Sequence, residues 1–241
     1  MRILYLHQYF APPTAAGSTR SYEFARRLIA SGHEVHMITS AARLPQYTSN
    51  SKVSRQDIAG IPTTVIHVPY ENPMPFNQRI QAFFEFAWLA SREVVKHKAD
   101  VVFATSTPLT IAIPGIAAKL WHRIPMVFEV RDLWPELPIA VGALKNPLAK
   151  AVAKWLEWLA YHSSVHVIAL SPGMADGVLR CGIPSDRVTV IPNSCDLHLF
   201  DVPPERGAKI RAALKLKSDQ PLVVYTGTFG LINGVDYLVD I

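Results

Sequence analysis

Cysteine is scarce in this chain, which has only Cys181 and Cys195 among 241 residues. Two cysteines without a CxxC spacing cannot form the disulfide framework of a small secreted domain. The nine histidines form no set with metal-ligand spacing, and most of them are expected to be structural. A reducing cytoplasm is therefore the expected compartment, and neither a metal nor a cofactor is expected.

Long hydrophobic runs are absent as well. The longest apolar candidate, residues 101–121, is interrupted by Pro108 and Lys119, and a membrane-spanning helix needs about 20 apolar residues. The opening Arg2-Ile-Leu-Tyr-Leu6 reads as a strand and carries no signal-peptide cleavage pattern. We therefore expect a protein without a leader peptide or a membrane span.

Charge is sparse and only slightly unbalanced. Charged residues make up 18% of the chain and hydrophobic residues 49%, which is typical of a globular protein with a substantial core. The formal net charge is +5. This excess is too small to indicate nucleic acid, but it suits nucleotide phosphates or an acidic membrane surface as partners.

Apolar runs and amphipathic stretches alternate through most of the chain. Strands are predicted at 3–6, 35–39, 63–68, 100–104, 126–130, 165–170 and 187–191. Helices are predicted at 19–30, 76–98, 109–122 and 145–162, and a further helix starts with Ser171 as its cap and Pro172 in its first turn. Residues 44–60 read as a loop. The alternation predicts an α/β fold, a Rossmann-like domain with a doubly wound parallel sheet.

The predicted strand 126–130 leads into Arg131-Asp-Leu-Trp-Pro-Glu136. Ligands of open α/β sheets bind at the carboxyl ends of the strands, so this cluster is expected to lie in a site. Pro135 disfavours helix at Trp134, which predicts a fixed loop. An Arg–Asp pair that only steadies a surface loop is the alternative.

The domain is expected to comprise residues 1–203. Pro203-Pro-Glu-Arg-Gly207 is typical of a linker, and residues 204–220 are assigned to one. Residues 221–226 again read as a buried strand. Residues 221–241 are therefore interpreted as the first strand and partial helix of a truncated second domain, because so short a segment cannot bury a core.

Five motifs, in order along the chain, resemble those of a known family. They are His7-Gln-Tyr-Phe-Ala-Pro-Pro13 with Gly17, Ser18 and Arg20; Gly32-His-Glu-Val35; Arg131-Asp-Leu-Trp-Pro-Glu136; Val190-Ile-Pro-Asn193 with Asp196 and Phe200; and Tyr225-Thr-Gly-Thr-Phe-Gly230. The chain resembles the N-terminal half of a retaining family 4 glycosyltransferase with the two-domain GT-B fold. The branch that it resembles builds bacterial surface polysaccharides, as the fucosamine and colanic-acid transferases do.

The resemblance implies transfer of a hexosyl-type sugar from a nucleotide sugar to an acceptor held by the N-terminal domain. It also implies that Gly17, Ser18, Gly227 and Gly230 face the donor diphosphate. Glycine allows close approach of the backbone, and the helix N-terminus after Gly17 favours negative charge. Ordinary turn glycines are the alternative. The fragment by itself is expected to be inactive.

Catalytic and acceptor residues are expected around the same cluster. Many family members have a histidine where this chain has Arg131, and an arginine cannot shuttle a proton. Asp132 is therefore the better candidate to contact the acceptor hydroxyl, with Arg131 beside it. His7, Trp134 and Glu136 are further candidates on the acceptor side.

The crossing to the second domain carries Asn193 and Asp196, which are assigned to the hinge or the acceptor side. An Asx turn explains them almost as well. Many family members have arginine and lysine in the glycine loop, where this chain has Thr228 and Asn233. Neutralisation of the leaving diphosphate is then expected to come partly from residues outside this chain.

The expected acceptor is a lipid-linked saccharide. Residues 44–60, 76–98 and 131–136 would surround a groove with apolar walls and a basic rim, which suits a sugar diphosphate on a polyprenyl tail. The predicted helix 145–162 carries lysines and tryptophans, a combination typical of an anionic membrane surface and of a peripheral protein. A core helix with a solvated basic face is the alternative.

Three other functions are compared with this one. A dinucleotide-binding oxidoreductase predicts GxGxxG after the first strand and an acidic residue at the end of the second, and both are missing. A nucleotide-sugar epimerase shares the two-domain scaffold and the donor, and differs in its product. A non-catalytic module that binds lipid or a protein partner is the third.

Overall fold

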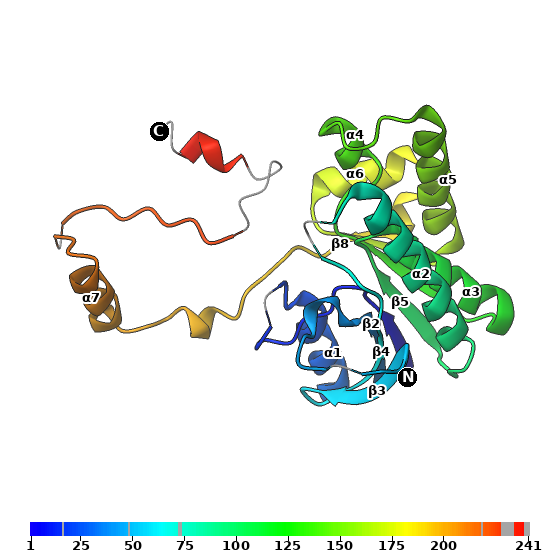
Figure 1. Ribbon diagram of the computed structural model, residues 1–241, viewed down its shortest axis with the longest axis horizontal. Helices are drawn as coiled ribbons and strands as arrows, with labels where there is room; N and C mark the ends of the chain where they lie inside the picture. The colour runs from blue at the N-terminus through cyan, green and yellow to red at the C-terminus, as the bar shows by residue number, and fades with distance from the viewer. Residues whose placement is uncertain (16, 48, 72–73, 218, 228–233, 239–241) are drawn as a thin grey trace. The chain divides into compact units, whose positions relative to one another are not determined.

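The computed structural model describes residues 1–241 apart from 16, 48, 72–73, 218, 228–233 and 239–241. The chain divides into two compact units, Met1–Pro192 and Asn193–Ile241. Every buried hydrophobic residue in the described part of the chain lies in the first unit. The sheet and the candidate site also belong to that unit (Figure 1).

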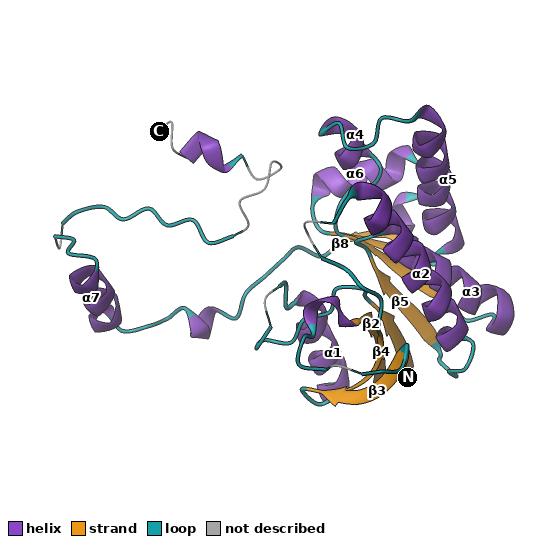
Figure 2. Ribbon diagram, in the orientation of Figure 1, coloured by secondary structure: helices purple, strands orange, loops and turns teal. Residues whose placement is uncertain are grey.

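An eight-stranded sheet forms the centre of the first unit (Figure 2). Its strands are β1 (Arg2–Leu6), β2 (Glu34–Ser40), β3 (Val53–Ile58), β4 (Ile61–Ile66), β5 (Val101–Thr105), β6 (Met126–Val130), β7 (His166–Ala169) and β8 (Val188–Val190). Their spatial order is β3-β4-β2-β1-β5-β6-β7-β8, and all neighbours are parallel except β3 and β4. The predicted α/β fold is confirmed, and β6 has the predicted ends.

Helices cover both faces of this sheet. They are α1 (Arg20–Ala30), α2 (Phe76–Val94), α3 (Ala112–His122), α4 (Glu136–Ala140), α5 (Pro147–Ser163) and α6 (Pro172–Arg180). Successive side chains of a strand point to opposite faces. In β1, Ile3 and Tyr5 join the core cluster that includes α1, whereas Leu4 and Leu6 join the cluster under α2, α3 and α5.

The starts of α5 and α6 follow from their caps. Ser171 Oγ accepts a hydrogen bond from the Met174 backbone N–H at 3.3 Å, and Pro172 opens α6 as predicted. Asn146 Oδ1 accepts from the Ala149 N–H at 3.1 Å. This second cap makes α5 begin at Pro147 rather than at the predicted residue 145, because the capping residue itself is not helical.

The prediction that residues 44–60 form a loop is wrong in part, because they contain β3. This strand pairs antiparallel with β4 at the edge of the sheet, through a tight turn at Ala59 and Gly60, both of which have positive φ. Its side chains are mostly polar, since an edge strand faces water and charged residues block further pairing. The polar composition therefore concealed the strand.

The segment after β6 also differs from the prediction. A fixed loop was expected through Glu136, and residues 131–135 are indeed irregular, but α4 begins at Glu136. Pro135 precedes the first turn of this helix, a position where the missing N–H costs nothing. The proline thus delays the helix and does not prevent it.

The second unit has little of the predicted structure. The proposed linker, residues 204–220, contains α7 (Pro204–Ala213), which buries no residue. The strand predicted at 221–226 is wrong: this segment has no regular structure and Val223 is 85% exposed. A strand needs a hydrogen-bonded neighbour, and none pairs with it among the described residues. The domain limits at residues 203 and 221 stay predictions.

Candidate functional site

The candidate site lies at the carboxyl ends of three adjacent strands. His7 follows β1, Ser106 and Thr107 follow β5, and Arg131 and Asp132 follow β6. Because these strands are neighbours in the order β1-β5-β6, their carboxyl ends meet at one edge of the sheet. The predicted position of the site at this edge therefore brings residues from three distant parts of the sequence together.

The Arg131 guanidinium is oriented by two partners. Its Nη2 donates to Ser18 Oγ at 2.9 Å, and its Nη1 lies 3.4 Å from His7 Nε2. Since arginine can only donate, Nε2 of His7 is the acceptor, which assigns the ring proton to Nδ1. Nδ1 then donates to Ser21 Oγ at 2.7 Å in the first turn of α1. A chain of hydrogen bonds thus connects α1 to the loop after β6.

The His7 imidazole is neutral in this setting. Burial, with a further contribution from the charge of Arg131, lowers the pKa of His7 to about 3. The side chain is 2% exposed and both ring nitrogens are engaged. His7 therefore holds Arg131 in place and is not set up to take up a proton near neutral pH.

The Asp132 carboxylate turns to the other side of the loop. Thr107 Oγ1 donates to Asp132 Oδ2 at 2.6 Å, and the Arg131 backbone N–H donates to Ser106 Oγ at 3.0 Å. Both hydrogen bonds tie the loop after β6 to the loop after β5. Arg131 and Asp132 thus have separate partners, so the simple Arg–Asp pair considered from the sequence does not describe them.

A buried ion pair lies behind this edge. Arg20 Nε and Nη2 donate to Glu129 Oε1 at 3.0 and 2.9 Å, with side-chain exposures of 6% and 0%. The same guanidinium donates to the backbone oxygens of Ile191 and Pro192, both at 2.8 Å, and lies 4.4 Å from the Phe24 ring centroid. Arg20 therefore joins α1, β6 and the segment after β8.

Four polar atoms near the site are buried without a hydrogen-bond partner among the described residues: Gln8 Oε1, Tyr9 Oη, Arg79 Nε and Glu129 Oε2. The Tyr9 ring lies 5.1 Å from the Tyr70 ring, and the Arg79 guanidinium lies 6.0 Å from the latter. Buried polar groups are nearly always satisfied in native proteins. These unpartnered groups leave hydrogen-bonding capacity for water or for a polar ligand.

Gly17 occupies a backbone conformation that other residues rarely adopt, with φ of +150°. A Cβ at this position would lie 3.2 Å from the Ala11 Cβ. The glycine is thus required by the loop itself, and its predicted approach to a diphosphate stays a prediction. Ser18, predicted to bind phosphate, accepts from Arg131 and so belongs to the cluster.

Two predicted acceptor residues lie outside this cluster. Trp134 is partly buried and packs against the hydrophobic core. The Glu136 carboxylate accepts from Arg180 Nη2 at 3.2 Å, and both side chains are more than half exposed. A surface ion pair of this kind explains Glu136 without a ligand.

The remaining predicted residues belong to the second unit. Asn193 is its exposed first residue, and Asp196 precedes a short 3₁₀ turn, Leu197–Leu199. A Cβ on Gly227 would lie 2.7 Å from Tyr225 Oη, the far end of a flexible side chain. Gly230 lies outside the described residues. The hinge and donor roles of these residues stay predictions.

A cavity of about 540 Å³ lies at the opposite edge of the sheet. Arg2, His33, Glu34 and His97 are among its lining residues, and they stand at the amino ends of the strands. Ligands of this fold class bind at the carboxyl ends. We therefore assign the cavity no part in the site.

Sequence reasoning identified the loop after β6 but not its supports. Ser21, Thr107 and the Arg20–Glu129 pair were missed as site residues. The available signal was Glu129 itself, a lone carboxylate within an apolar run, because a buried charge requires a partner. Its partner is 109 residues away in the sequence, so only the fold identifies it.

Comparison with known families and proteins agrees with this geometry. The family model of Glycosyltransferase Family 4 matches residues 17–199. D-inositol 3-phosphate glycosyltransferase of Xylanimonas cellulosilytica is 28% identical over 93% of this chain and 54% of its own length. Alpha-galactosylglucosyldiacylglycerol synthase of Streptococcus pneumoniae is 29% identical over 39% of this chain and 26% of its own.

Solved structures share the fold. Sucrose-phosphate synthase from Thermosynechococcus elongatus matches 99% of this chain and 58% of its own, with a TM-score of 0.70 and 18% identity. Anabaena HepE in complex with UDP-glucose matches 89% of this chain and 50% of its own, with a TM-score of 0.52 and 21% identity. These likenesses show the expected GT-B fold. The chain spans about half the length of such proteins.

Proposed function

Because the chain belongs to Glycosyltransferase Family 4, we propose that it is the acceptor-binding half of an enzyme that transfers a hexosyl-type sugar from a nucleotide sugar. The observation that carries the proposal is the Arg131 guanidinium at the sheet edge, fixed by His7 and Ser18, with the Asp132 carboxylate beside it. The complex of HepE with UDP-glucose supports a nucleotide sugar as donor.

Asp132 is the residue that contacts the acceptor hydroxyl. When the acceptor oxygen bonds to the anomeric carbon of the donor, the bond from that carbon to the diphosphate breaks, and the proton of the hydroxyl passes to the departing nucleoside diphosphate. A carboxylate with one oxygen held by Thr107 can accept a hydrogen bond from that hydroxyl and orient it. Arg131 stays charged and binds phosphate, since a guanidinium pairs with phosphate oxygens and cannot take up the proton.

The acceptor is a saccharide linked to a lipid through a diphosphate. Arg131 and Arg79 supply two cations, and the unsatisfied Tyr9 Oη and Arg79 Nε can donate to the oxygens of a sugar phosphate. The unsatisfied Gln8 Oε1 can accept from a sugar hydroxyl. The Streptococcus relative, whose name describes a glycolipid synthase, supports a lipid-borne acceptor. The product is then part of a surface polysaccharide, as in the fucosamine and colanic-acid transferase branch.

The proposed groove involves less of residues 44–60 than the sequence alone suggests. Only residues 44–53 can lie at this edge, because β3 runs antiparallel and places its Ala59–Gly60 turn at the amino ends of the strands. Helix α2 and the loop 131–135 remain as walls. The acceptor-binding surface is thus formed by fewer residues of the 44–60 segment than predicted.

Transfer assays of a protein extended to the length of the relatives test this function. We expect incorporation from one of a panel of nucleotide sugars into a short polyprenyl-diphosphate sugar. Asp132→Asn is expected to lower kcat by about 100-fold or more with little change in stability. The matched control Asp186→Asn, an exposed carboxylate far along the chain, should leave kcat unchanged.

Two results would contradict the proposal. Efficient transfer to a soluble sugar, with the lipid-linked substrate ignored, would overturn the acceptor class. An equal loss of activity and stability in Asp132→Asn would return Asp132 to a structural role. The 241-residue chain alone is expected to show no turnover, because the donor phosphates need both domains.

A further inference from the structure

The outer surface of three helices carries large apolar side chains that nothing in the first unit covers. They are Phe84 and Trp88 on α2, Trp121 on α3, and Val152, Trp155 and Trp158 on α5. We call this surface the aromatic face. Helix α2 packs against α3, and α3 against α5, so the three helices form one layer on one side of the sheet (Figures 1 and 2).

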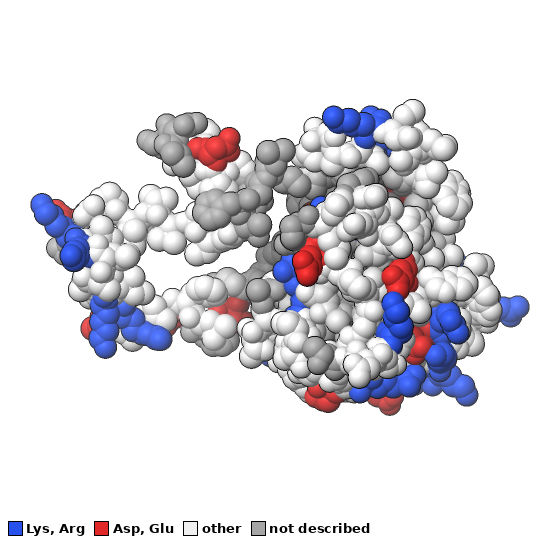
Figure 3. Space-filling view, in the orientation of Figure 1, with Lys and Arg blue, Asp and Glu red and all other residues white. Residues whose placement is uncertain are grey.

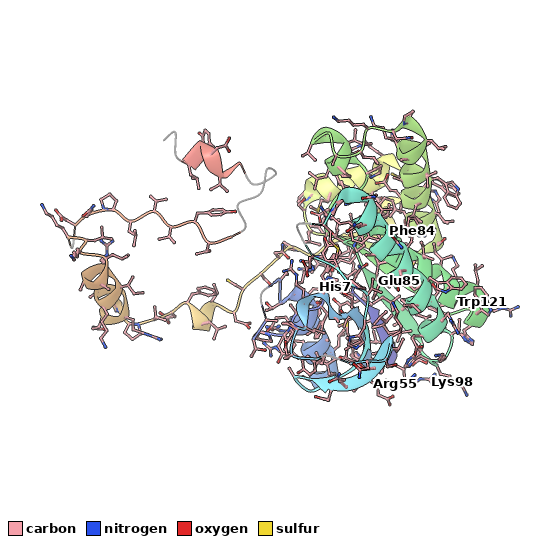
Figure 4. All side chains as sticks on the ribbon, viewed as in Figure 1. His7, Arg55, Phe84, Glu85, Lys98 and Trp121 are labelled. Atoms are coloured by element: carbon pink, nitrogen blue, oxygen red, sulfur yellow. The ribbon has the colours of Figure 1, made fainter. Side chains whose placement is uncertain are left out.

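Tryptophan is concentrated on this face. The chain has five tryptophans, and four of them lie here, with exposures of 66% at Trp88, 70% at Trp121, 59% at Trp155 and 48% at Trp158. Figure 4 shows Phe84 on α2 and Trp121 at the end of α3. Scattered exposed apolar residues need no explanation, but several on adjacent helices mark an interaction surface.

The charges around these side chains are mainly positive. Lys119 and Arg123 stand at the end of α3, Lys150 and Lys154 lie on α5, and Arg92 ends the outer stripe of α2. In the space-filling view most of the surface over α2 is uncharged, and both acidic and basic side chains lie on it or at its margins (Figure 3). Lysine stems can lie along an apolar surface while the ammonium groups reach anions.

Acidic side chains on the same helices are neutralised or buried. Glu85 pairs with Lys52 at 2.7 Å, and Glu93, whose side chain is 5% exposed, pairs with Arg55. Glu157 is buried and accepts from the Tyr161 hydroxyl. Among the described residues of α2, α3 and α5, no unpaired carboxylate therefore opposes the cations.

We propose that the aromatic face docks on the anionic surface of a lipid bilayer. Tryptophan is favoured where an apolar layer meets water, because its ring is largely apolar and its indole N–H is polar. Lysine at the same level is attracted to anionic lipids, whereas lysine is depleted in protein–protein interfaces. The pairing of tryptophan with lysine therefore favours a membrane over a protein partner or a second copy of this chain.

The docking is peripheral and independent of sugar transfer. None of the described helices is both long and apolar enough to cross a membrane. Helices α2, α3 and α5 instead pack on one face of the sheet, and their exposed apolar side chains are available for shallow insertion. The loops that carry His7 and Arg131 remain at the edge of the sheet and are not covered by this contact.

Vesicle binding by the 241-residue protein tests this proposal. The probes are vesicles of phosphatidylcholine alone and of phosphatidylcholine mixed with phosphatidylglycerol. We expect co-sedimentation and a blue shift of tryptophan emission with the anionic vesicles, both reduced by added salt. Lys150→Gln with Lys154→Gln should weaken this binding roughly 30-fold. Trp121→Ser with Trp155→Ser should reduce the blue shift, with Trp88 and Trp158 left as reporters.

The matched control removes the same charge elsewhere. Lys209→Gln with Lys217→Gln in the second unit should weaken binding less than about twofold, since both lysines lie outside the aromatic face. The proposal is overturned if the control pair weakens binding as much as the α5 pair. It is also overturned if anionic vesicles cause no shift, or if the tryptophans are instead shielded by concentration-dependent dimerisation. Circular dichroism of each variant establishes that it is folded.

Discussion

Arg20 and Glu129 form an ion pair in which both side chains are buried. Glu129 sits in the middle layer of the sheet, where an unpaired carboxylate would be strongly disfavoured. Arg20 offers it two N–H groups and uses the remaining donors on backbone oxygens. The pair costs desolvation of two charges, so its value lies in fixing α1 against β6 rather than in large net stabilisation.

Glu129→Gln should lower the free energy of unfolding by about 3 kcal/mol, because it leaves the Arg20 cation buried without its counter-ion. Urea-induced unfolding followed by circular dichroism measures this. Glu136→Gln is the matched control: it breaks the exposed pair with Arg180, which is expected to contribute less than about 1 kcal/mol. Equal effects of the two substitutions would contradict the assignment of the Arg20–Glu129 pair as a buried support.

Helix α5 combines an outer stripe of exposed side chains with a buried carboxylate. Burial is the main cause that raises the pKa of Glu157, to about 7 from its ordinary value of 4.5. Between these two values the unfolded chain has released the proton and the folded chain still holds it. The stabilising contribution is therefore present at low pH and is lost as pH rises through this range.

Glu157→Gln should remove this pH dependence. The glutamine oxygen can still accept from the Tyr161 hydroxyl but carries no charge at any pH. Relative to the variant, the unsubstituted protein should lose more than about 1 kcal/mol of unfolding free energy between pH 5 and pH 8. Urea titrations of both proteins at each pH check this, and parallel curves for the two would show that Glu157 ionises normally.

The difference in unfolding free energy between the unsubstituted protein and Glu157→Gln isolates the contribution of Glu157 from those of other groups. His7 acts in the opposite direction: its lowered pKa of about 3 means that the unfolded chain binds a proton first as pH falls below its ordinary value of 6.5. Its contribution is thus lost towards acid pH, and it is common to both proteins. Subtracting the stability curve of one protein from that of the other therefore removes the contribution of His7.

At the scale of the whole molecule, the two units differ in how many of their residues are buried from solvent and from proteases. The first contains the sheet and the core, whereas α7, apart from the half-buried Arg211, and the segment 221–227 of the second are exposed. Exposed, poorly packed backbone is the preferred substrate of proteases.

Limited trypsin digestion should therefore cut first after Arg206 and Lys209 in α7, near the predicted linker 202–207, and leave a resistant fragment containing residues 1–192. Mass spectrometry of the early products identifies the cuts. Lys119 and Arg123, which are exposed but belong to the folded first unit, serve as internal controls and should be cut later. Protection of the α7 sites equal to that of these two would contradict the division.

Much of the fold could be read from the sequence because each signal is local. An apolar run such as 126–130 fits only a strand buried on both faces, and Ser171-Pro172 gives a cap and a first turn without reference to the rest of the chain. The polar edge strand β3 and the exposed segment 221–226 were misread for the same reason. A strand forms only beside a hydrogen-bonded neighbour: β3 has β4, whereas no strand pairs with 221–226 among the described residues.

The candidate site was likewise predictable where its signals are local, and unpredictable where distant segments meet. The sequence by itself determined the α/β fold and placed Arg131 and Asp132 just after a buried strand, since both follow from local periodicity. Only the tertiary structure decided that Arg131 binds His7 and Ser18, that Glu136 pairs with Arg180, and that four tryptophans share one face. These depend on which distant segments the sheet order brings together, and sheet order is set by the packing of the whole core and not by any one stretch of sequence.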